Sequence, residues 1–312
     1  MRAASIGCLG FTLALFANVA SAETIILTPT ADTSIMELLP HFNFGAQEDL
    51  PSGTLGGSAN FTRSRILVKF DLAGALPANT TIHSAILKLT VTRAPDGGGV
   101  NSIFAAHRIL RPWGEGAKKG NAPGGAMAGV REATWQMRFH PDESWGLPGG
   151  QPGVDYVEAP SSSERVLGTG AYEFEFGAMA ILEMQAWLND PSSNFGWMLL
   201  TQAEQAPKSA RRFAAREFPE PNARPVLIIE FSASPKLVPP TITSISLTNG
   251  HATIRFGTLI GAQYGLQARD ALDRGDWETL AWLKGSSLLG QLTLTNETSS
   301  RTQRFYRILA TD

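Results

Sequence analysis

The sequence has almost no cysteine and few charged residues. Of 312 residues, only Cys8 is a cysteine, and 17% are Asp, Glu, Lys or Arg. One cysteine excludes an internal disulfide, so a buried core or a bound ion must hold the fold together. The formal net charge of −2 gives no sign of the clustered basic surface that nucleic acids require. We therefore expect no nucleic-acid partner.

The familiar signatures of catalysis are also missing. The sequence has no Gly-x-Ser-x-Gly elbow, no His-Glu-x-x-His helix and no phosphate-cradling glycine loop. Its histidines are scattered without the spacing of metal ligands. They are His41, His83, His107, His140 and His251. We therefore expect a protein that carries out no reaction of its own.

The one long apolar run stands at the N-terminus. Arg2 precedes the apolar residues 6–19, and Ala20-Ser21-Ala22 follows them. This order is typical of a secretory signal peptide, and the run is shorter than the ~20 residues of a membrane-spanning helix. We predict a signal peptide over residues 1–22, cleaved after Ala22, which also removes Cys8. The mature protein is then secreted, either extracellular or periplasmic, and has no membrane span.

Glycine, proline and alternating apolar residues are plentiful. The 31 Gly and 19 Pro residues suit short strands joined by turns. Residues 84–92 and 102–110 alternate with the period of a half-buried strand. Further strands are predicted at 24–27, 65–72, 172–176, 196–200 and 224–231. One short helix is predicted at 178–188, and the whole pattern indicates an all-β sandwich or barrel.

A Ser- and Pro-rich segment at 233–240 predicts a linker between two domains, 23–232 and 241–312. The second domain has its own strand pattern. Its strands are predicted at 241–247, 252–256, 264–268, 290–294 and 304–309. We expect its small core to be filled by Trp277, Trp282, Phe305 and Tyr306.

Short motifs of the first domain occur in the order found in one known family. They include Ala31-Asp32-Thr33-Ser34-Ile35, Asn43-Phe44-Gly45, Phe70-Asp71-Leu72, Trp113-Gly114-Glu115-Gly116, Ala133-Thr134-Trp135, Asn194-Phe195-Gly196, Phe213-Ala214-Ala215-Arg216-Glu217 and Arg224-Pro225-Val226-Leu227. Over about residues 24–232 this set resembles the DNRLRE family, also described as carbohydrate-binding module family 96. The resemblance implies a jelly-roll-like β-sandwich and a role in polysaccharide recognition or in larger surface proteins. The chain departs from the family in a longer Gly/Ala/Lys loop before Thr134.

The second domain resembles a small β-sandwich module that follows many exported bacterial proteins. The resemblance rests on residues 264–272, on Trp277-Glu278-Thr279-Leu280 and on Arg304-Phe305-Tyr306-Arg307. It implies a small fibronectin-III-like β-sandwich.

Aromatic and basic residues gather in or beside the irregular stretch 111–170. Aromatic rings stack on sugar faces, and arginines pair with carboxylates. We therefore predict a site for an acidic polysaccharide, such as a uronate polymer. Its residues are Trp113, Trp135, Trp145, Tyr156, Arg108, Arg131 and Arg138. The alternative is that the tryptophans pack in the core. A second basic cluster, Arg211, Arg212 and Arg216, either binds a uronate or pairs internally.

Calcium is the ion that this composition favours, because hard oxygen ligands suit an exported sandwich. The candidate ligands are Asp32, Asn43 and Glu217, since the first and last strands of such a sandwich can meet. The alternative is that Asp32 caps a turn and Glu217 pairs with Arg216 or Arg65.

Three functions remain open from the sequence. The first is a secreted, non-catalytic module that binds a polysaccharide or a cell-surface glycan. The second is a structural subunit of an extracellular matrix, surface layer or filament, which self-associates. The third is a polysaccharide lyase or hydrolase with a site built from Tyr156, His140 and Arg138.

Overall fold

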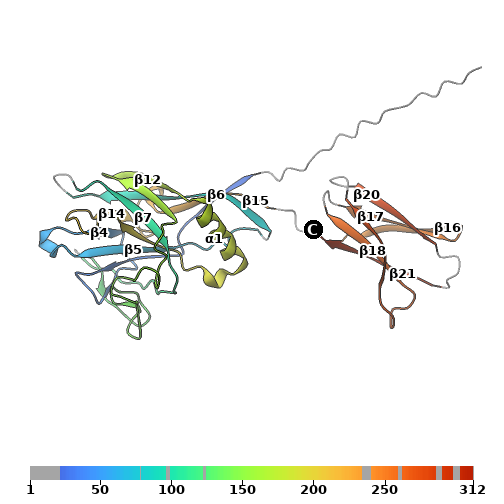
Figure 1. Ribbon diagram of the computed structural model, residues 1–312, viewed down its shortest axis with the longest axis horizontal. Helices are drawn as coiled ribbons and strands as arrows, with labels where there is room; N and C mark the ends of the chain where they lie inside the picture. The colour runs from blue at the N-terminus through green and yellow to red at the C-terminus, as the bar shows by residue number, and fades with distance from the viewer. Residues whose placement is uncertain are drawn as a thin grey trace, which may run out of the picture. The chain divides into compact units, whose positions relative to one another are not determined.

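The computed structural model describes residues 22–77, 79–95, 99–121, 124–233, 240–258, 262–285, 290–297 and 303–311. Within these ranges the chain is mostly β, which confirms the all-β prediction (Figure 1). It divides into two compact units, one spanning Ser21–Ser234 and one containing Pro235–Asp312, and this division falls inside the predicted linker segment. The predicted signal peptide lies outside the described residues, apart from Ala22. No helix in the described ranges combines the length and apolar character needed to cross a membrane.

The first unit is built on one curled antiparallel sheet. Its strands are β1 (Glu23–Leu27), β2 (Ala31–Met36), β4 (Asp49–Thr54), β5 (Arg63–Lys69), β6 (Thr80–Arg93), β7 (Ser102–Arg108), β11 (Ser162–Val166), β12 (Gly170–Glu175), β13 (Trp197–Thr201), β14 (Arg211–Ala214) and β15 (Val226–Ala233). The hydrogen-bonded order is β1-β15-β6-β14-β4-β5-β13-β7-β11, with β12 beside β6 and β2 beside β5. The loops add short paired strands: β3 (Phe42–Asn43) with β8 (Ala126–Met127), and β9 (Met137–Phe139) with β10 (Glu143–Ser144).

Strand β4 carries the sheet from one layer of the sandwich to the other. Residues 49–52 pair with β14, whereas Gly53 and Thr54 pair with β5. The bend falls at Gly53, whose φ of 110° favours glycine. A Cβ at this position would lie 2.7 Å from the Cα of Ala210. The result is two layers, β1/β15/β6/β12/β14 and β2/β5/β13/β7/β11.

The second of these layers is buried on both faces. In β5, Ile66 and Val68 point into the main core between the layers, where Phe104 of β7 meets Phe213 of β14 edge-on at 5.4 Å. Leu67 points the opposite way, as strand geometry requires. It joins a second cluster, here called the outer cluster, which the loops of residues 109–160 cover. The outer cluster comprises Ile35, Leu67, Ile109, Ala133, Trp135, Trp145, Tyr156 and Met198.

The predicted helix is present as α1 (Ala178–Asn189). It buries Ala180, Met184 and Trp187, which share one face of the helix. The Trp187 ring meets the Trp197 ring of β13 at 5.0 Å. The helix therefore closes one part of the main core.

The second unit contains two three-stranded antiparallel sheets, β16-β17-β20 and β19-β18-β21. Their bounds are β16 (Ile242–Thr248), β17 (His251–Thr258), β18 (Gln263–Arg269), β19 (Glu278–Lys284), β20 (Gly290–Glu297) and β21 (Phe305–Thr311). Its core is built from Ala252, Ile254, Phe256, Ala262, Tyr264 and Leu266. The expected core role of Trp282 is wrong. Trp282 lies on the edge strand β19, where its ring covers Gly265 of β18, and the residue stays 51% exposed. The guanidinium groups of Arg269 and Arg307 lie 4.6 and 4.4 Å from the centroid of the Trp277 ring, both within cation–π distance.

Candidate functional site

Three of the four aromatic residues expected to bind sugar are buried in the outer cluster. Trp135, Trp145 and Tyr156 expose only 3%, 3% and 7% of their surface. Trp113 is half-buried, and its indole nitrogen donates to the carbonyl of Phe195 at 2.9 Å. Because stacking on a sugar needs an open ring face, the three buried rings cannot serve as a platform in this conformation. They pack as a core, the alternative that the sequence left open.

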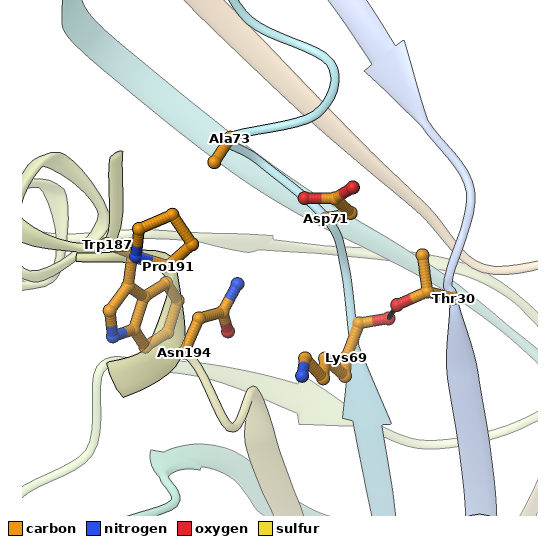
Figure 2. Close-up of a pocket in the computed structure, with 7 residues that line it drawn as sticks. All are labelled: Thr30, Lys69, Asp71, Ala73, Trp187, Pro191 and Asn194. Carbon is orange, nitrogen blue, oxygen red and sulfur yellow. Dashed lines mark hydrogen bonds between the residues drawn. The ribbon is translucent and has the colours of Figure 1, made fainter. Parts of the chain in front are cut away.

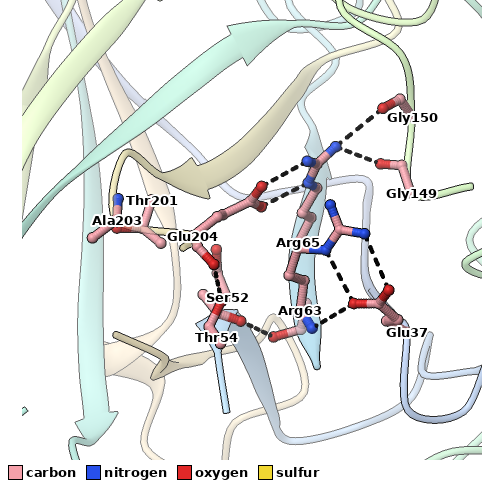
Figure 3. A network of polar contacts seen from close by, with 12 residues as sticks. Glu37, Ser52, Thr54, Arg63, Arg65, Gly149, Gly150, Thr201, Ala203 and Glu204 are labelled. Atoms are coloured by element: carbon pink, nitrogen blue, oxygen red, sulfur yellow. Dashed lines mark hydrogen bonds and ion pairs between the residues drawn. The ribbon is translucent and has the colours of Figure 1, made fainter. Parts of the chain in front are cut away.

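Arg65 contacts Glu204 and the main chain at Gly149 and Gly150 (Figure 3). Its guanidinium donates to both carboxylate oxygens of Glu204 at 2.8 and 2.7 Å. It also donates to the carbonyls of Gly149 and Gly150 at 2.9 and 3.1 Å. The same group lies 5.8 Å from the Trp135 ring centroid, a cation–π distance. A strand side chain thus ties the 146–156 loop to the sheet.

The predicted sugar-binding arginines are paired within the protein. Arg108 donates to Glu183 at 2.8 Å, and Arg138 pairs with Glu143. Arg131 lies 3.8 Å from Glu143 and stacks over Phe139. The partner carboxylates neutralise this basic surface locally, so it offers little free charge to an acidic polysaccharide.

The second basic cluster is also used internally. Arg211 is 1% exposed and donates to main-chain carbonyls that include Leu167 and Val100, both at 2.8 Å. Arg212 pairs with Asp49, and Arg216 pairs with Glu115. These arginines are therefore paired within the protein, which is one of the two alternatives that the sequence left open.

Tyr156, His140 and Arg138 do not form a catalytic group. Within the described ranges, no hydrogen bond joins any two of them. Tyr156 packs edge-on against His107 at 5.4 Å, and Arg138 is held by Glu143 and by the carbonyl of Pro112. Burial raises the pKa of Tyr156, which disfavours the tyrosinate that a general base would need.

We expect His107 to make the stability of this region depend on pH. Its Nδ1 donates to the carbonyl of Val157 at 2.9 Å, and burial lowers its pKa. Its stabilising contribution is then complete above the unfolded pKa of about 6.5 and is lost as the pH falls through the folded pKa. We expect His107→Gln to reduce the acid loss of unfolding free energy, by up to about 1.4 kcal/mol per pH unit across that window. Urea titrations from pH 8 to pH 5 test this, with the exposed His83→Gln as the control. An unchanged slope in His107→Gln would contradict it.

The predicted metal ligands lie near one another, together with a carboxylate that was not expected. Asp32 accepts from the amide of Arg216 at 2.8 Å, and its own amide donates to Glu115 at 2.8 Å. The Arg216 side chain contacts Glu115 at 2.7 Å and Glu217 at 3.0 Å. We call Asp32, Glu115, Arg216 and Glu217 the acidic junction. It brings together three of the motifs on which the family resemblance rests.

Burial sets the electrostatics of the acidic junction. It raises the pKa of Asp32 to about 8, assisted by Glu217 and Glu115 and opposed by the hydrogen bond from Arg216. Burial also raises the pKa values of Glu115 and Glu217.

Asn43 stands apart as a scaffold residue. Its amide nitrogen donates to the Glu115 and Ala133 carbonyls, and its oxygen accepts from the amides of Gly45 and Lys118.

A surface pocket of about 270 Å³ lies at the end of β5 (Figure 2). Thr30, Lys69 and Asp71 lie along one side, and Trp187, Pro191 and Asn194 lie along the other. Asp71 accepts from the amide of Gly74 with one carboxylate oxygen. In the described part of the chain, Lys69 makes no ion pair. The pocket therefore offers both a cation and a carboxylate to a polar ligand.

A second pocket, of about 430 Å³, adjoins the first at Ala73. Its other lining residues are Leu76, Pro77, Asn79, Thr80, Gln185, Leu188 and Asn189. The last turn of α1 contributes to both pockets, through Trp187 to the first and through Leu188 and Asn189 to the second. We call the two pockets together the α1 groove.

Sequence reasoning missed Glu204, Glu115 and the α1 groove. The alternation Arg63-Ser64-Arg65 could have indicated that Arg65 needs a buried partner such as Glu204. In a strand it places both arginines on the face that carries the apolar Leu67. Nothing local marked Lys69 and Trp187 as neighbours, because 118 positions separate them in the sequence.

Comparison with known proteins adds no assignment. No family model matches the chain, and no curated protein matches it.

Proposed function

We propose that the first unit is an exported, non-catalytic module that binds a polysaccharide in the α1 groove. The observation that carries this proposal is the pair of adjoining pockets, of about 270 and 430 Å³, with Lys69 and Asp71 at one end. Sugars are bound through hydroxyl groups, which need donors and acceptors side by side. The Lys69 ammonium and the Asp71 carboxylate supply both.

An acidic polysaccharide fits this groove better than a neutral one. The ammonium of Lys69 can pair with a sugar carboxylate, whereas Arg108, Arg131 and Arg138 are already paired with Glu183 or Glu143. The ligand class is the one expected from the sequence, but the proposed site is the α1 groove and no longer the 111–170 region. The signal peptide predicted from the sequence supports export, and the resemblance to carbohydrate-binding module family 96 supports glycan recognition.

Affinity gel electrophoresis tests the proposal. We expect alginate in the gel to retard the purified protein, and Lys69→Ala to weaken binding about tenfold or more, since hydrogen bonds to charged groups contribute ~1.5–3 kcal/mol. Lys88→Ala on β6 is the matched control, because this lysine lies outside the groove. Asp71→Asn keeps an acceptor for the amide of Gly74 and removes a negative charge from the groove, so it should not weaken the binding of a polyanion.

Several results would overturn the proposal. Wild-type protein that migrates freely through gels of acidic and neutral polysaccharides would remove the binding function. Self-association in light scattering without added glycan would favour the structural-subunit alternative. An increase in unsaturated-uronate absorbance would favour a lyase.

A further inference from the structure

One sheet of the second unit carries an exposed tryptophan on its outer face. In the sheet β19-β18-β21, Tyr264 and Leu266 of the central strand point into the core, so Gly265 between them points outward. Gly265 is in register with Trp282 of β19 and with Leu309 of β21. Because residues directly opposite each other share a face, Trp282 lies on the outer face, where it is 51% exposed.

The missing side chain of Gly265 lets the indole ring lie flat against the sheet. A Cβ at Gly265 would be 3.0 Å from Cη2 and Cζ3 of Trp282 and 3.2 Å from Cε3. These are three consecutive ring atoms at nearly equal distances, so the ring meets the glycine with its face and not with its edge. The main chain supports one face of the ring, and the other is available to solvent. An open, supported ring of this kind can stack on the apolar face of a sugar.

A row of polar side chains lies next to the ring on the same face. Gln267 of β18 donates to Oγ1 of Thr279 at 2.9 Å and accepts from Nε of Arg307 at 2.8 Å. The Arg307 guanidinium also lies 4.4 Å from the centroid of the Trp277 ring. These contacts hold Arg307 in place without neutralising it. Its side chain is exposed and makes no ion pair with a described residue.

The charge of this outer face is positive. Its positions are 263, 265, 267 and 269 of β18, the odd-numbered positions 305–311 of β21 and their partners on β19, and none of them is acidic. The charged residues among them are Arg269, Lys284 and Arg307. Of the acidic residues nearby, Glu278 pairs with Arg304, and Asp270 and Asp276 line a pocket at the end of the sheet with Arg269. Lys284 and Arg307 therefore remain to attract an anion.

We propose that Trp282, Lys284 and Arg307, here called the Trp282 platform, bind an acidic polysaccharide. Trp282 stacks on one sugar ring, and the two basic side chains pair with sugar carboxylates on either side of it. The register places Trp282 between the Lys284 row and the Arg307 row. Successive rows on one face are about 7 Å apart along the strands, so a polymer is needed to reach all three groups. This site lies in the second unit and does not depend on the α1 groove.

Affinity gel electrophoresis of the full chain in alginate tests the platform, with Lys69→Ala as the background that removes the contribution of the α1 groove. In this background we expect clear residual retardation. Adding Trp282→Ala should weaken it about three- to tenfold, the usual effect of losing one ring contact. Trp282→Phe should retain most of the binding. Leu247→Ala is the matched control, because Leu247 is an apolar residue on β16 of the other sheet and is 69% exposed. It should leave binding unchanged.

Salt dependence separates the role of the ring from the role of the charge. Arg307→Gln should weaken binding about three- to tenfold at low ionic strength and should reduce the salt dependence, because exposed charges are screened by salt. Trp282→Ala should weaken binding by a similar factor at low and high salt. Acrylamide quenching places the ligand on the ring: alginate should protect part of the tryptophan fluorescence, and Trp282→Phe should remove that protection.

The outcomes distinguish the platform from the α1 groove. If Lys69→Ala alone abolished retardation, the platform would not be a binding site, and the groove proposal would stand. If Lys69→Ala bound like the wild type and Trp282→Ala did not, the groove proposal would fail, and the platform would stand. Full binding by the Trp282→Ala variant in the Lys69→Ala background would overturn the platform. So would a wild-type dimer in sedimentation that Trp282→Ala dissociates, because a second copy would then cover this face.

Discussion

Replacing Arg65 with alanine is expected to lower the free energy of unfolding of the first unit by about 3–5 kcal/mol. The Arg65 and Glu204 side chains are only 8% and 13% exposed, and removing one partner of such a pair leaves a buried charge unpaired. The change also leaves the carbonyls of Gly149 and Gly150 without a donor. Urea denaturation followed by tryptophan fluorescence measures the loss.

Arg63→Ala is the matched control. Arg63 lies two residues away on the same face and pairs with Glu37, but its side chain is 36% exposed. We expect a loss of about 1 kcal/mol or less, as for other exposed pairs. The double variant Arg65→Met, Glu204→Leu should recover much of the stability, since both charges are then absent. Equal losses in Arg63→Ala and Arg65→Ala would contradict the buried role of Arg65.

Replacing Trp145 with alanine is expected to destabilise the protein by about 3–5 kcal/mol, the usual cost of removing a buried tryptophan ring. Trp145 is 3% exposed, and its indole nitrogen donates to the carbonyl of Thr134 at 2.9 Å. The variant leaves a cavity under the loops and an acceptor without its donor. Thermal or urea unfolding gives the size of the effect.

The control for Trp145 is Trp282→Ala in the second unit, where the ring is 51% exposed. It should cost far less. A binding measurement completes the test, because the sequence-based interpretation made Trp145 a ligand-binding residue. If Trp145→Ala kept its stability and lost affinity for glycan, the outer cluster would be the binding site and the α1 groove would not.

Strands were predictable here because their signals are local. Residues 84–92 alternate between apolar and polar side chains, and the structure extends that strand to Thr80–Arg93. The helix at 178–188 was predicted from apolar spacing within one segment and is present as α1. In β5, however, Ile66-Leu67-Val68 is apolar without alternation. This run is explained only by the covering loops, which bury the outer face as well as the inner one.

The site was harder to predict, because it depends on partners that are distant in sequence. Whether the charge of Arg108 is free or neutralised depends on the position of Glu183, which is 75 positions later in the sequence. Whether Trp135 can stack on a sugar or packs as a core residue depends on whether the loop that carries Gly149 covers its ring. Composition alone cannot decide either case. The approach of Asp32 to Glu217 was expected, because the first and last strands of a sandwich can meet. The role of Glu115 was not expected, because it lies in a loop.

Strand β4 has a consequence for how the first unit unfolds. Because β4 pairs with β14 and with β5, the hydrogen-bonded backbone is continuous through both layers, and β4 bends between them at Gly53. The two layers cannot separate unless the pairing of β4 with β14 or with β5 is broken. The two layers are therefore expected to unfold as a single cooperative unit, whereas the loops of residues 109–160 can open without disturbing that continuity.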